Sequence, residues 1–222
     1  MNRLARLLFC VLLLGGSQWL AAPASAQISH SEGGAVDATA AAVLKKAADR
    51  FGQNVGFGVT VTVLDGQQKQ TLRQSAQVLY HGGRYRVTVG DQEVISDGKM
   101  VWQWNKTANE VAVSTASADD IDLLNPGRLL AGYEKAFRAK YIRTEADGTA
   151  VVDLQPRSAR HFHKIRLLVD EKSGLLRRME VHRYDSGREL YEIANFKKAN
   201  TPNSRFTFDT AKHPEAEIID MR

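Results

Sequence analysis

The sequence lacks most of the residues and motifs that carry covalent chemistry. Its single cysteine, Cys10, lies in an apolar run near the start, so the chain beyond it can form neither a disulfide nor a thiol nucleophile. The hydrolase motif G-x-S-x-G and the zinc motif H-E-x-x-H are both missing. These absences exclude thiol catalysis, argue against an enzyme, and leave the fold to depend on its apolar core.

A strong excess of one charge is also missing. The chain has 30 lysines and arginines against 25 acidic residues, a formal net charge of +5. Nucleic-acid binders concentrate basic residues on one face, so we expect no nucleic-acid partner. No linker or low-complexity segment divides the 222 residues, and this length suits one domain with a sizeable core.

The first 26 residues have the three parts of a secretory signal peptide. Arg3 and Arg6 form the positive start, Leu7–Leu14 is the apolar run, and Ala24–Ala26 is an A-x-A cleavage site. The run is shorter than the roughly 20 residues that span a bilayer, which makes a retained anchor the weaker alternative. We therefore expect residues 1–26 to be removed, leaving a single domain at 27–222. Without the two leader arginines its net charge falls from +5 to +3.

The next segment changes from a helical to a strand pattern. Apolar residues recur at helical spacing up to Phe51, and Asp37 can cap the N-terminus, which predicts a helix over 37–51. Alternating strands with turns such as Asp65–Gly66 follow, typical of an antiparallel meander. We expect strands near 57–63, 71–80, 85–89, 93–96, 100–104, 110–114, 141–145, 151–155, 164–170, 175–182 and 189–196, with a short apolar piece at 206–208.

The meander is interrupted between residues 115 and 138. Pro126 can occupy the first turn of a second helix, whose apolar stripe would be Leu129, Leu130, Tyr133 and Phe137. About ten strands imply a strongly curved antiparallel sheet that closes or half closes to hide its edges. We predict a mainly β (α+β) fold in which the two helices cover the concave face of this sheet.

Polar residues give little sign of a reactive site. His161 and His163 could face one way on a strand and bind a metal, but a polar strand entry explains them better. Asp119, Asp120 and Asp122 fit helix capping better than cation binding. We expect neither a metal nor a cofactor.

The aromatic residues are more informative. Trp102 and Trp104 lie two apart on one strand face, and we expect Tyr85 on a neighbouring strand. They fit two interpretations, ordinary cross-strand core pairs or the wall of an apolar ligand cavity. Periodicity alone does not separate the two.

The stretch from Gly83 to Val113 resembles the central signature of the LolA family. It contains the core S-D-G-K-x-x-W, from Ser96 to Trp102, followed by a return strand that ends in E-V-x-V. Asn125–Pro126 and the chain's ending from Phe206 onward resemble the Bacteroidetes branch of that family. The likeness covers nearly all of the chain after the leader, in order.

This resemblance implies a periplasmic carrier rather than an enzyme. LolA-like proteins are half-open β-barrels with a helical lid over an apolar hollow. They accept a lipoprotein from an inner-membrane ABC exporter, shield its acyl chains, and deliver it to an outer-membrane receptor or the outer membrane surface. Each buried CH₂ is worth about 0.8 kcal/mol, so bare acyl chains need such shelter. We expect a monomer.

The resemblance also suggests which residues form the cavity and its lid. We expect the acyl-chain cavity to be lined by Phe57, Val59, Val61, Tyr80, Tyr85, Val87, Trp102 and Trp104. The lid candidates are Leu123, Leu124, Leu129, Leu130 and Tyr133. Many family members carry an Arg-Pro whose arginine contacts the lid. This chain has His81–Gly82 there, so His81 or the nearby Arg84 is the candidate latch, and a histidine latch would respond to pH.

Two other functions stay open from the sequence. A module of the same fold could sense or carry another amphiphile, such as a fatty acid or glycolipid. A secreted enzyme with an active site outside the known motifs is the third possibility, which the missing nucleophile and metal patterns disfavour.

Overall fold

The structure, a computed structural model, describes residues 37–116 and 126–222. The expected signal peptide, the lid candidates Leu123 and Leu124, and the aspartates at 119, 120 and 122 lie outside the described residues.

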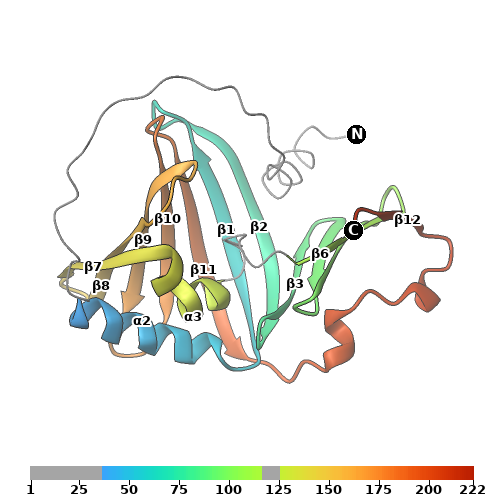
Figure 1. The fold of residues 1–222 in the computed structure, drawn as a ribbon, viewed down its shortest axis with the longest axis horizontal. Coiled ribbons are helices and arrows are strands. Elements are labelled where there is room, and N and C mark those ends of the chain that lie inside the picture. Colours follow the sequence, from blue (N-terminus) through green and yellow to red (C-terminus); the bar gives the residue numbers. More distant parts are fainter. Residues whose placement is uncertain (1–36, 117–125) are drawn as a thin grey trace. The chain divides into compact units, whose positions relative to one another are not determined.

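Twelve strands form one curved sheet that does not close on itself (Figure 1). Its order is β12-β6-β5-β4-β3-β2-β1-β11-β10-β9-β8-β7. The strands are β1 (Val55–Leu64), β2 (Gln70–His81), β3 (Arg84–Val89), β4 (Gln92–Ser96), β5 (Met100–Asn105), β6 (Glu110–Thr115), β7 (Phe137–Thr144), β8 (Thr149–Pro156), β9 (Phe162–Asp170), β10 (Leu176–Arg183), β11 (Arg188–Lys198) and β12 (Glu217–Asp220). The predicted fold class is confirmed.

One long-range pairing joins the two halves of the meander. β1, the first strand in the chain, pairs antiparallel with β11, so Val59 lies opposite Ile193 and Val61 opposite Tyr191. Hairpin neighbours make the other antiparallel ladders. The β1–β11 pairing brings residues about 130 positions apart onto one continuous surface.

The helix α2 (Ala38–Phe51) forms as its sequence pattern predicts. One Asp37 carboxylate oxygen accepts a hydrogen bond from the Ala40 backbone N–H at 3.0 Å, and the other accepts one from Tyr141 of β7 at 2.8 Å. The bonds from Ala40 and Tyr141 hold the pKa of Asp37 below its ordinary value. The buried stripe of α2 consists of Ala40, Val43, Leu44, Ala47 and Phe51.

The helix α3 (Pro126–Ala136) begins at the predicted proline but ends earlier than expected. Phe137, expected in the helical stripe, is instead the first residue of β7 and stacks on Phe162, with ring centroids 6.3 Å apart. Arg157 explains the ending, because its backbone N–H bonds the Ala136 carbonyl at 2.8 Å and its side chain bonds the Glu134 carbonyl at 2.9 Å. These bonds satisfy helix carbonyls that would otherwise have no donor.

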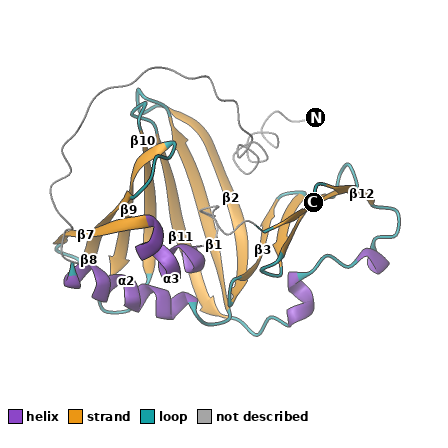
Figure 2. Cartoon of the chain, in the orientation of Figure 1, coloured by secondary structure: helices purple, strands orange, loops and turns teal. Residues whose placement is uncertain are grey.

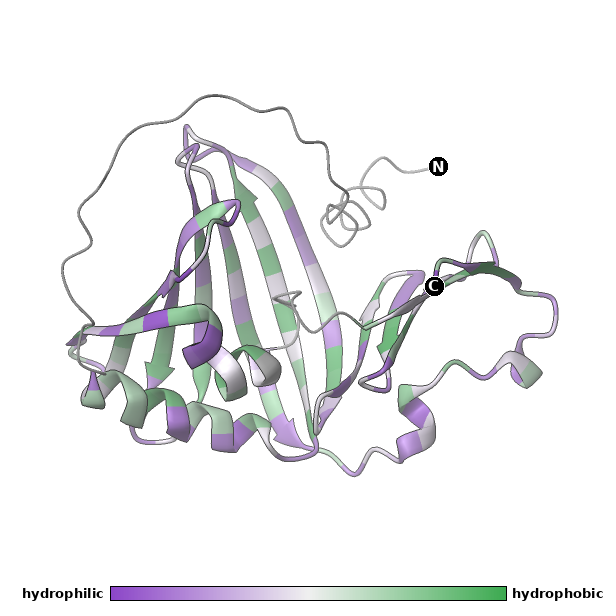
Figure 3. Ribbon diagram, viewed as in Figure 1, coloured by the Kyte–Doolittle hydropathy of each residue, from purple (hydrophilic) through white to green (hydrophobic). Residues whose placement is uncertain are grey.

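Hydrophobic and hydrophilic residues alternate along the strands (Figure 3), so the two faces of the sheet differ in polarity. The face covered by α2 and α3 carries apolar residues such as Phe57, Leu167 and Val181. The opposite face of β8, β9 and β10 carries ion pairs, including Asp153 with Arg166 at 2.7 Å. An apolar face covered by helices and a polar face in solvent is the expected arrangement for an antiparallel sheet.

The C-terminal segment packs against the opposite face of β4–β6. It contains the short 3₁₀ helices η1 (Asn203–Phe206) and η2 (Thr210–Lys212), joined by loops (Figure 2). Phe208 completes a core cluster with Ile95, Val111 and Val113. The segment ends in β12, which pairs parallel with β6. The sequence predicted only the apolar piece at 206–208, so β12 is an addition.

Candidate functional site

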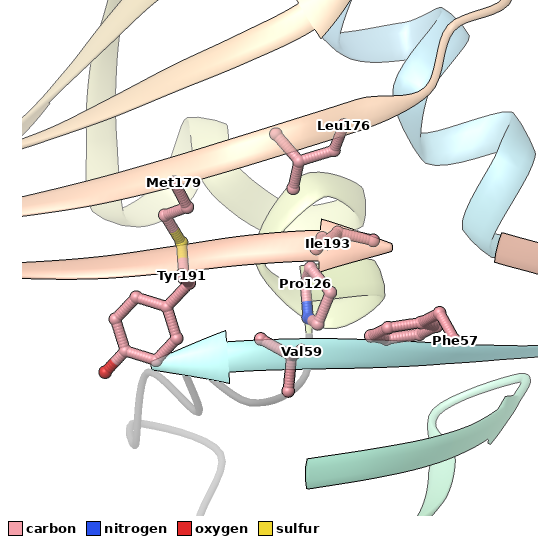
Figure 4. A pocket seen from close by; sticks show the side chains of 7 residues that line it. All are labelled: Phe57, Val59, Pro126, Leu176, Met179, Tyr191 and Ile193. Carbon is pink, nitrogen blue, oxygen red and sulfur yellow. The ribbon is translucent and has the colours of Figure 1, made fainter. Parts of the chain in front are cut away.

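A small apolar cavity lies between the sheet and α3 (Figure 4). Its lining residues come from three strands and the start of the helix: Phe57, Val59, Pro126, Leu176, Met179, Tyr191 and Ile193. The cavity has a volume of about 10 Å³, enough for about one water molecule. A cavity of this volume is far too small to hold an acyl chain.

The sheet register explains why these residues meet. Tyr191 of β11 lies between Val61 of β1 and Met179 of β10, so the three side chains share one face. Tyr191 and Met179 were missed by the sequence prediction. Met179 lies between Arg178 and Glu180, a pattern that marks it as inward-facing, whereas Tyr191 follows Leu190 and carries no such signal. The β1–β11 pairing places Tyr191 near Val59.

An aromatic cluster borders the cavity beneath α2. The Phe57 ring meets the Phe51 ring edge-on at 5.6 Å and stacks on the Phe196 ring at 6.0 Å. Phe51 also contacts Tyr80 edge-on, with ring centroids 6.5 Å apart. Phe57 is thus held by rings from α2 and β11, which fixes one wall of the cavity.

The start of α3 rests directly on the ring of Tyr80. A Cβ added to Gly127 would lie 2.5 Å from the Cζ atom of Tyr80, so only glycine permits this close approach. The Tyr80 hydroxyl in turn accepts a hydrogen bond from the Gly83 backbone N–H at 3.1 Å. Three lid candidates on this helix are buried: Leu129, Leu130 and Tyr133 are 7%, 2% and 8% exposed. Burial raises the pKa of the Tyr133 phenol.

A comparison with protein-family profiles shows which family the chain belongs to. The profile described as "Outer membrane lipoprotein carrier protein LolA" matches residues 61–209. The chain belongs to the LolA family. A search of curated proteins gave no match.

A solved structure shares the fold of this LolA chain. It is an uncharacterized conserved protein from Thermus thermophilus, 12% identical, with a TM-score of 0.55 over 82% of this chain and 99% of that one. Two others are less similar. A LolA superfamily protein from Nitrosomonas europaea is 13% identical, with a TM-score of 0.44 over 77% and 98%. LprF from Mycobacterium bovis is 16% identical, with a TM-score of 0.43 over 76% and 97%.

The remaining cavity candidates of this LolA chain divide between the two faces. Tyr85 pairs with Tyr80, and Val87 pairs with Val78, so both share the helix-covered face with Phe57 but lie further along the sheet than the cavity. Val61 lies next to Tyr191 on that face. Only Phe57 and Val59 of the predicted set line the cavity itself.

Trp102 and Trp104 lie on the opposite face, which corrects their predicted place in the cavity wall. Tyr85 pairs with Ser96 and Ser96 with Val101, so Trp102 points to the other side of the sheet. Tyr85 also lies two strands away from the tryptophans rather than on the neighbouring one. Trp104 packs on Phe208 at 5.4 Å and on His213 at 4.3 Å between ring centroids. In this chain the tryptophans of the family signature hold the C-terminal segment.

His81 and Arg84 also lie away from the lid, which corrects the predicted latch. They pair with each other across β2 and β3, on the face opposite to Tyr80. Arg84 lies over the Phe206 ring at 5.8 Å, and the His81 ring is 6.5 Å from the same ring. Both residues therefore contact the C-terminal segment instead of α3.

The polar candidates form no compact site in the described part of the chain. His161 precedes β9, whereas His163 lies on it beside His182, with ring centroids 6.1 Å apart. Among residues 37–116 and 126–222, no group of three or more His, Cys, Asp or Glu side chains is placed to hold a metal ion. Neither α2 nor α3 is long and apolar enough to cross a bilayer.

Proposed function

We propose that the chain is a periplasmic carrier that shelters the acyl chains of lipoproteins between the concave face of its sheet and α3. The observation that carries this proposal is the cavity under Pro126, whose lining includes no charged side chain. Membership of the LolA family supports a binding and transport role over catalysis. The cavity candidates that share this face, from Phe57 and Val59 to Tyr85 and Val87, would extend the wall once α3 moves.

A comparison of burial energies favours opening by an acyl chain. Leaving the sheet would expose Leu129, Leu130 and Tyr133, at a cost of about 2 kcal/mol each. A 16-carbon chain would bury roughly 15 CH₂ groups, worth on the order of 12 kcal/mol. On these figures, burial of one acyl chain outweighs the exposure of these three side chains.

The attachments of α3 suggest how it would move. Its last turn is bonded by Arg157 and continues directly into β7. Its first turn lies against the Tyr80 ring at Gly127. The helix would therefore swing about the Ala136–Phe137 junction, with its N-terminal end leaving the sheet first.

The proposed route begins with export of the chain and cleavage after Ala26. In the periplasm the carrier would act as a monomer. It would receive a lipoprotein from an inner-membrane ABC exporter and release it to an outer-membrane receptor or to the outer membrane surface.

Native mass spectrometry of protein taken from the periplasm tests this function. We expect a co-purifying acylated lipoprotein, and we expect depletion of the carrier to leave lipoproteins in the inner membrane. Free lipid alone, with unchanged lipoprotein sorting after depletion, would contradict the carrier and favour a module for another amphiphile. Turnover of a bound molecule that is lost with one polar residue would favour an enzyme.

A further inference from the structure

One acidic residue lies on the apolar, helix-covered face of the sheet. Glu189 of β11 is only 7% exposed and is flanked by Val63 of β1 and Val181 of β10, its partners on the two neighbouring strands. Its carboxylate accepts a hydrogen bond from the Tyr191 hydroxyl at 2.8 Å. Tyr191 itself lines the apolar cavity, so Glu189 is hydrogen-bonded to a residue of the cavity wall.

Glu189 differs from the other buried acids in having no cation beside it. Glu93 is paired with Arg86 and Lys106, and Asp153 is paired with Arg166 and Lys164. Among the residues that the structure describes, no lysine, arginine or histidine nitrogen lies within 4 Å of the Glu189 carboxylate. A buried carboxylate is costly unless it is paired and fully hydrogen-bonded.

A different residue on the same face has a buried acceptor without a donor. The side-chain oxygen of Gln74 is buried and has no hydrogen-bond partner. Val61 lies opposite Gln74 on one neighbouring strand and opposite Tyr191 on the other, so the Gln74 side chain points to the same face as Tyr191. This face therefore combines an apolar cavity, a buried acid without a paired cation and one acceptor without a donor.

We propose that Glu189 binds the primary ammonium head group of an amphiphile whose chain occupies the apolar cavity. This inference rests on the proposed function, because it requires α3 to admit an acyl chain. Two residues along a strand span about 7 Å, so a head group at Glu189 would stand immediately beyond a chain that ends at Tyr191. An ammonium offers both a positive charge and three N–H donors, whereas a phosphate or carboxylate would be repelled.

Three ligands with the same chain test the head-group preference on the intact mature protein. Dodecylammonium carries charge and N–H donors, dodecyltrimethylammonium carries charge alone, and dodecanol carries one donor without charge. We expect calorimetry to give at least tenfold tighter binding of dodecylammonium than of the other two. Equal binding of all three by the wild-type protein would overturn the inference, whatever the variants do.

Glu189→Gln removes the charge while keeping the shape of the side chain. We expect the preference for dodecylammonium to disappear, while dodecanol binds as before. Glu192→Gln is the matched control, because Glu192 lies on the same strand, points to the opposite face and pairs with Arg178. It should keep the full preference. A preference that survives in Glu189→Gln, or falls equally in Glu192→Gln, would contradict a head-group site.

Two diacylated peptides identify the source of the ammonium group. One has a free amino terminus and the other an acetylated one, and a lipid amine such as phosphatidylethanolamine is the third ligand. Stronger binding of the free peptide indicates a peptide amino terminus, and stronger binding of the lipid amine indicates a lipid head group. If acetylation has no effect and the lipid amine binds no better than dodecanol, the head-group site at Glu189 is refuted. The proposed carrier function is not affected by that result. If no acylated ligand binds at all, the proposed carrier function fails as well.

Discussion

Gly127 illustrates how the absence of one side chain sets the position of a helix. Because it has no Cβ, the first turn of α3 can lie against the ring of Tyr80. Any larger residue must push either the ring or the helix away, since the required contact of 2.5 Å is far inside van der Waals distance. The position of the proposed lid thus depends on this glycine.

Gly127→Ala should destabilise the closed state by about 1–3 kcal/mol, the usual cost of overpacking. It should also speed the entry of a fluorescent fatty acid, because the helix is displaced before the ligand arrives. Gly132→Ala is the control, since Gly132 lies exposed in the same helix with open space around it. Alanine there should stabilise the protein by about 0.5–1 kcal/mol. Thermal unfolding and stopped-flow binding measure both effects, and identical behaviour of the two variants would contradict the contact.

Asp153 is a buried acid whose ion pairs make stability depend on pH. Burial alone would raise the pKa of its carboxyl, but the hydrogen bonds and charges of Arg166 and Lys164 outweigh burial and lower it. A lowered folded-state pKa gives stability that is present above the unfolded pKa near 3.9 and is lost as the pH falls. The wild-type protein should therefore lose stability progressively below about pH 5.

Asp153→Asn should cost about 1.5–3 kcal/mol at neutral pH, the range for hydrogen bonds that involve charged groups. It should also make the loss of stability between about pH 5 and 3 less steep, because residue 153 then has no carboxylate to protonate. Urea unfolding at several pH values measures both. Asp49→Asn serves as control, because Asp49 pairs with Lys45 at an exposed site, where such pairs contribute about 0.5 kcal/mol or less. If the free energy of unfolding of Asp153→Asn depends on pH as steeply as that of the wild type, Asp153 is not the source of the acid sensitivity.

At the scale of elements, the C-terminal segment covers β4, β5 and β6 on the face opposite to the helices. Without it, Trp102, Trp104, Val111 and Val113 would form an exposed apolar patch. β12 also covers the edge of β6, and uncovered sheet edges favour aggregation. The segment is therefore part of the folded sheet although most of it is loop.

Phe208→Ala should release this segment at a cost of about 3 kcal/mol, the lower end for a buried phenylalanine. The tryptophan emission should shift to the red as Trp104 becomes exposed, and proteases should cleave within residues 203–222. Thr207→Ala is the control, because Thr207 is the exposed neighbour of Phe208. Unchanged emission in Phe208→Ala would mean that other contacts hold the segment.

At the scale of the whole molecule, the two faces of the sheet have separate roles. The face under α2 and α3 holds the cavity, and the opposite face holds Trp102 and Trp104. Ligand binding should therefore leave the environment of the two tryptophans unchanged.

A brominated fatty acid, which quenches nearby tryptophans, tests this separation. We expect little quenching of Trp102 and Trp104 in the mature wild-type protein and strong quenching in Phe57→Trp. Tyr184→Trp, at a position that is 70% exposed, should remain unquenched by bound ligand. Strong quenching in the wild type would mean that acyl chains bind on the tryptophan face.

The sequence by itself determined the elements and their polarity. The cap at Asp37, the start at Pro126 and the alternation from Phe57 to Val61 are local signals, because periodicity and capping depend only on residues a few positions apart. They sufficed for the two helices, nearly all the strands and the curved-sheet class.

Only the tertiary structure decided which face each element presents and what covers it. Trp102 and Phe57 have the same alternating pattern, yet the ladders through β2, β3 and β4 place them on opposite faces, and the later residue Phe208 supplies the cover. Tyr191 and Glu189 entered the site only through the pairing of β1 with β11. Alternation has a period of two and fixes two faces without distinguishing them, so the choice depends on contacts between residues far apart in the chain.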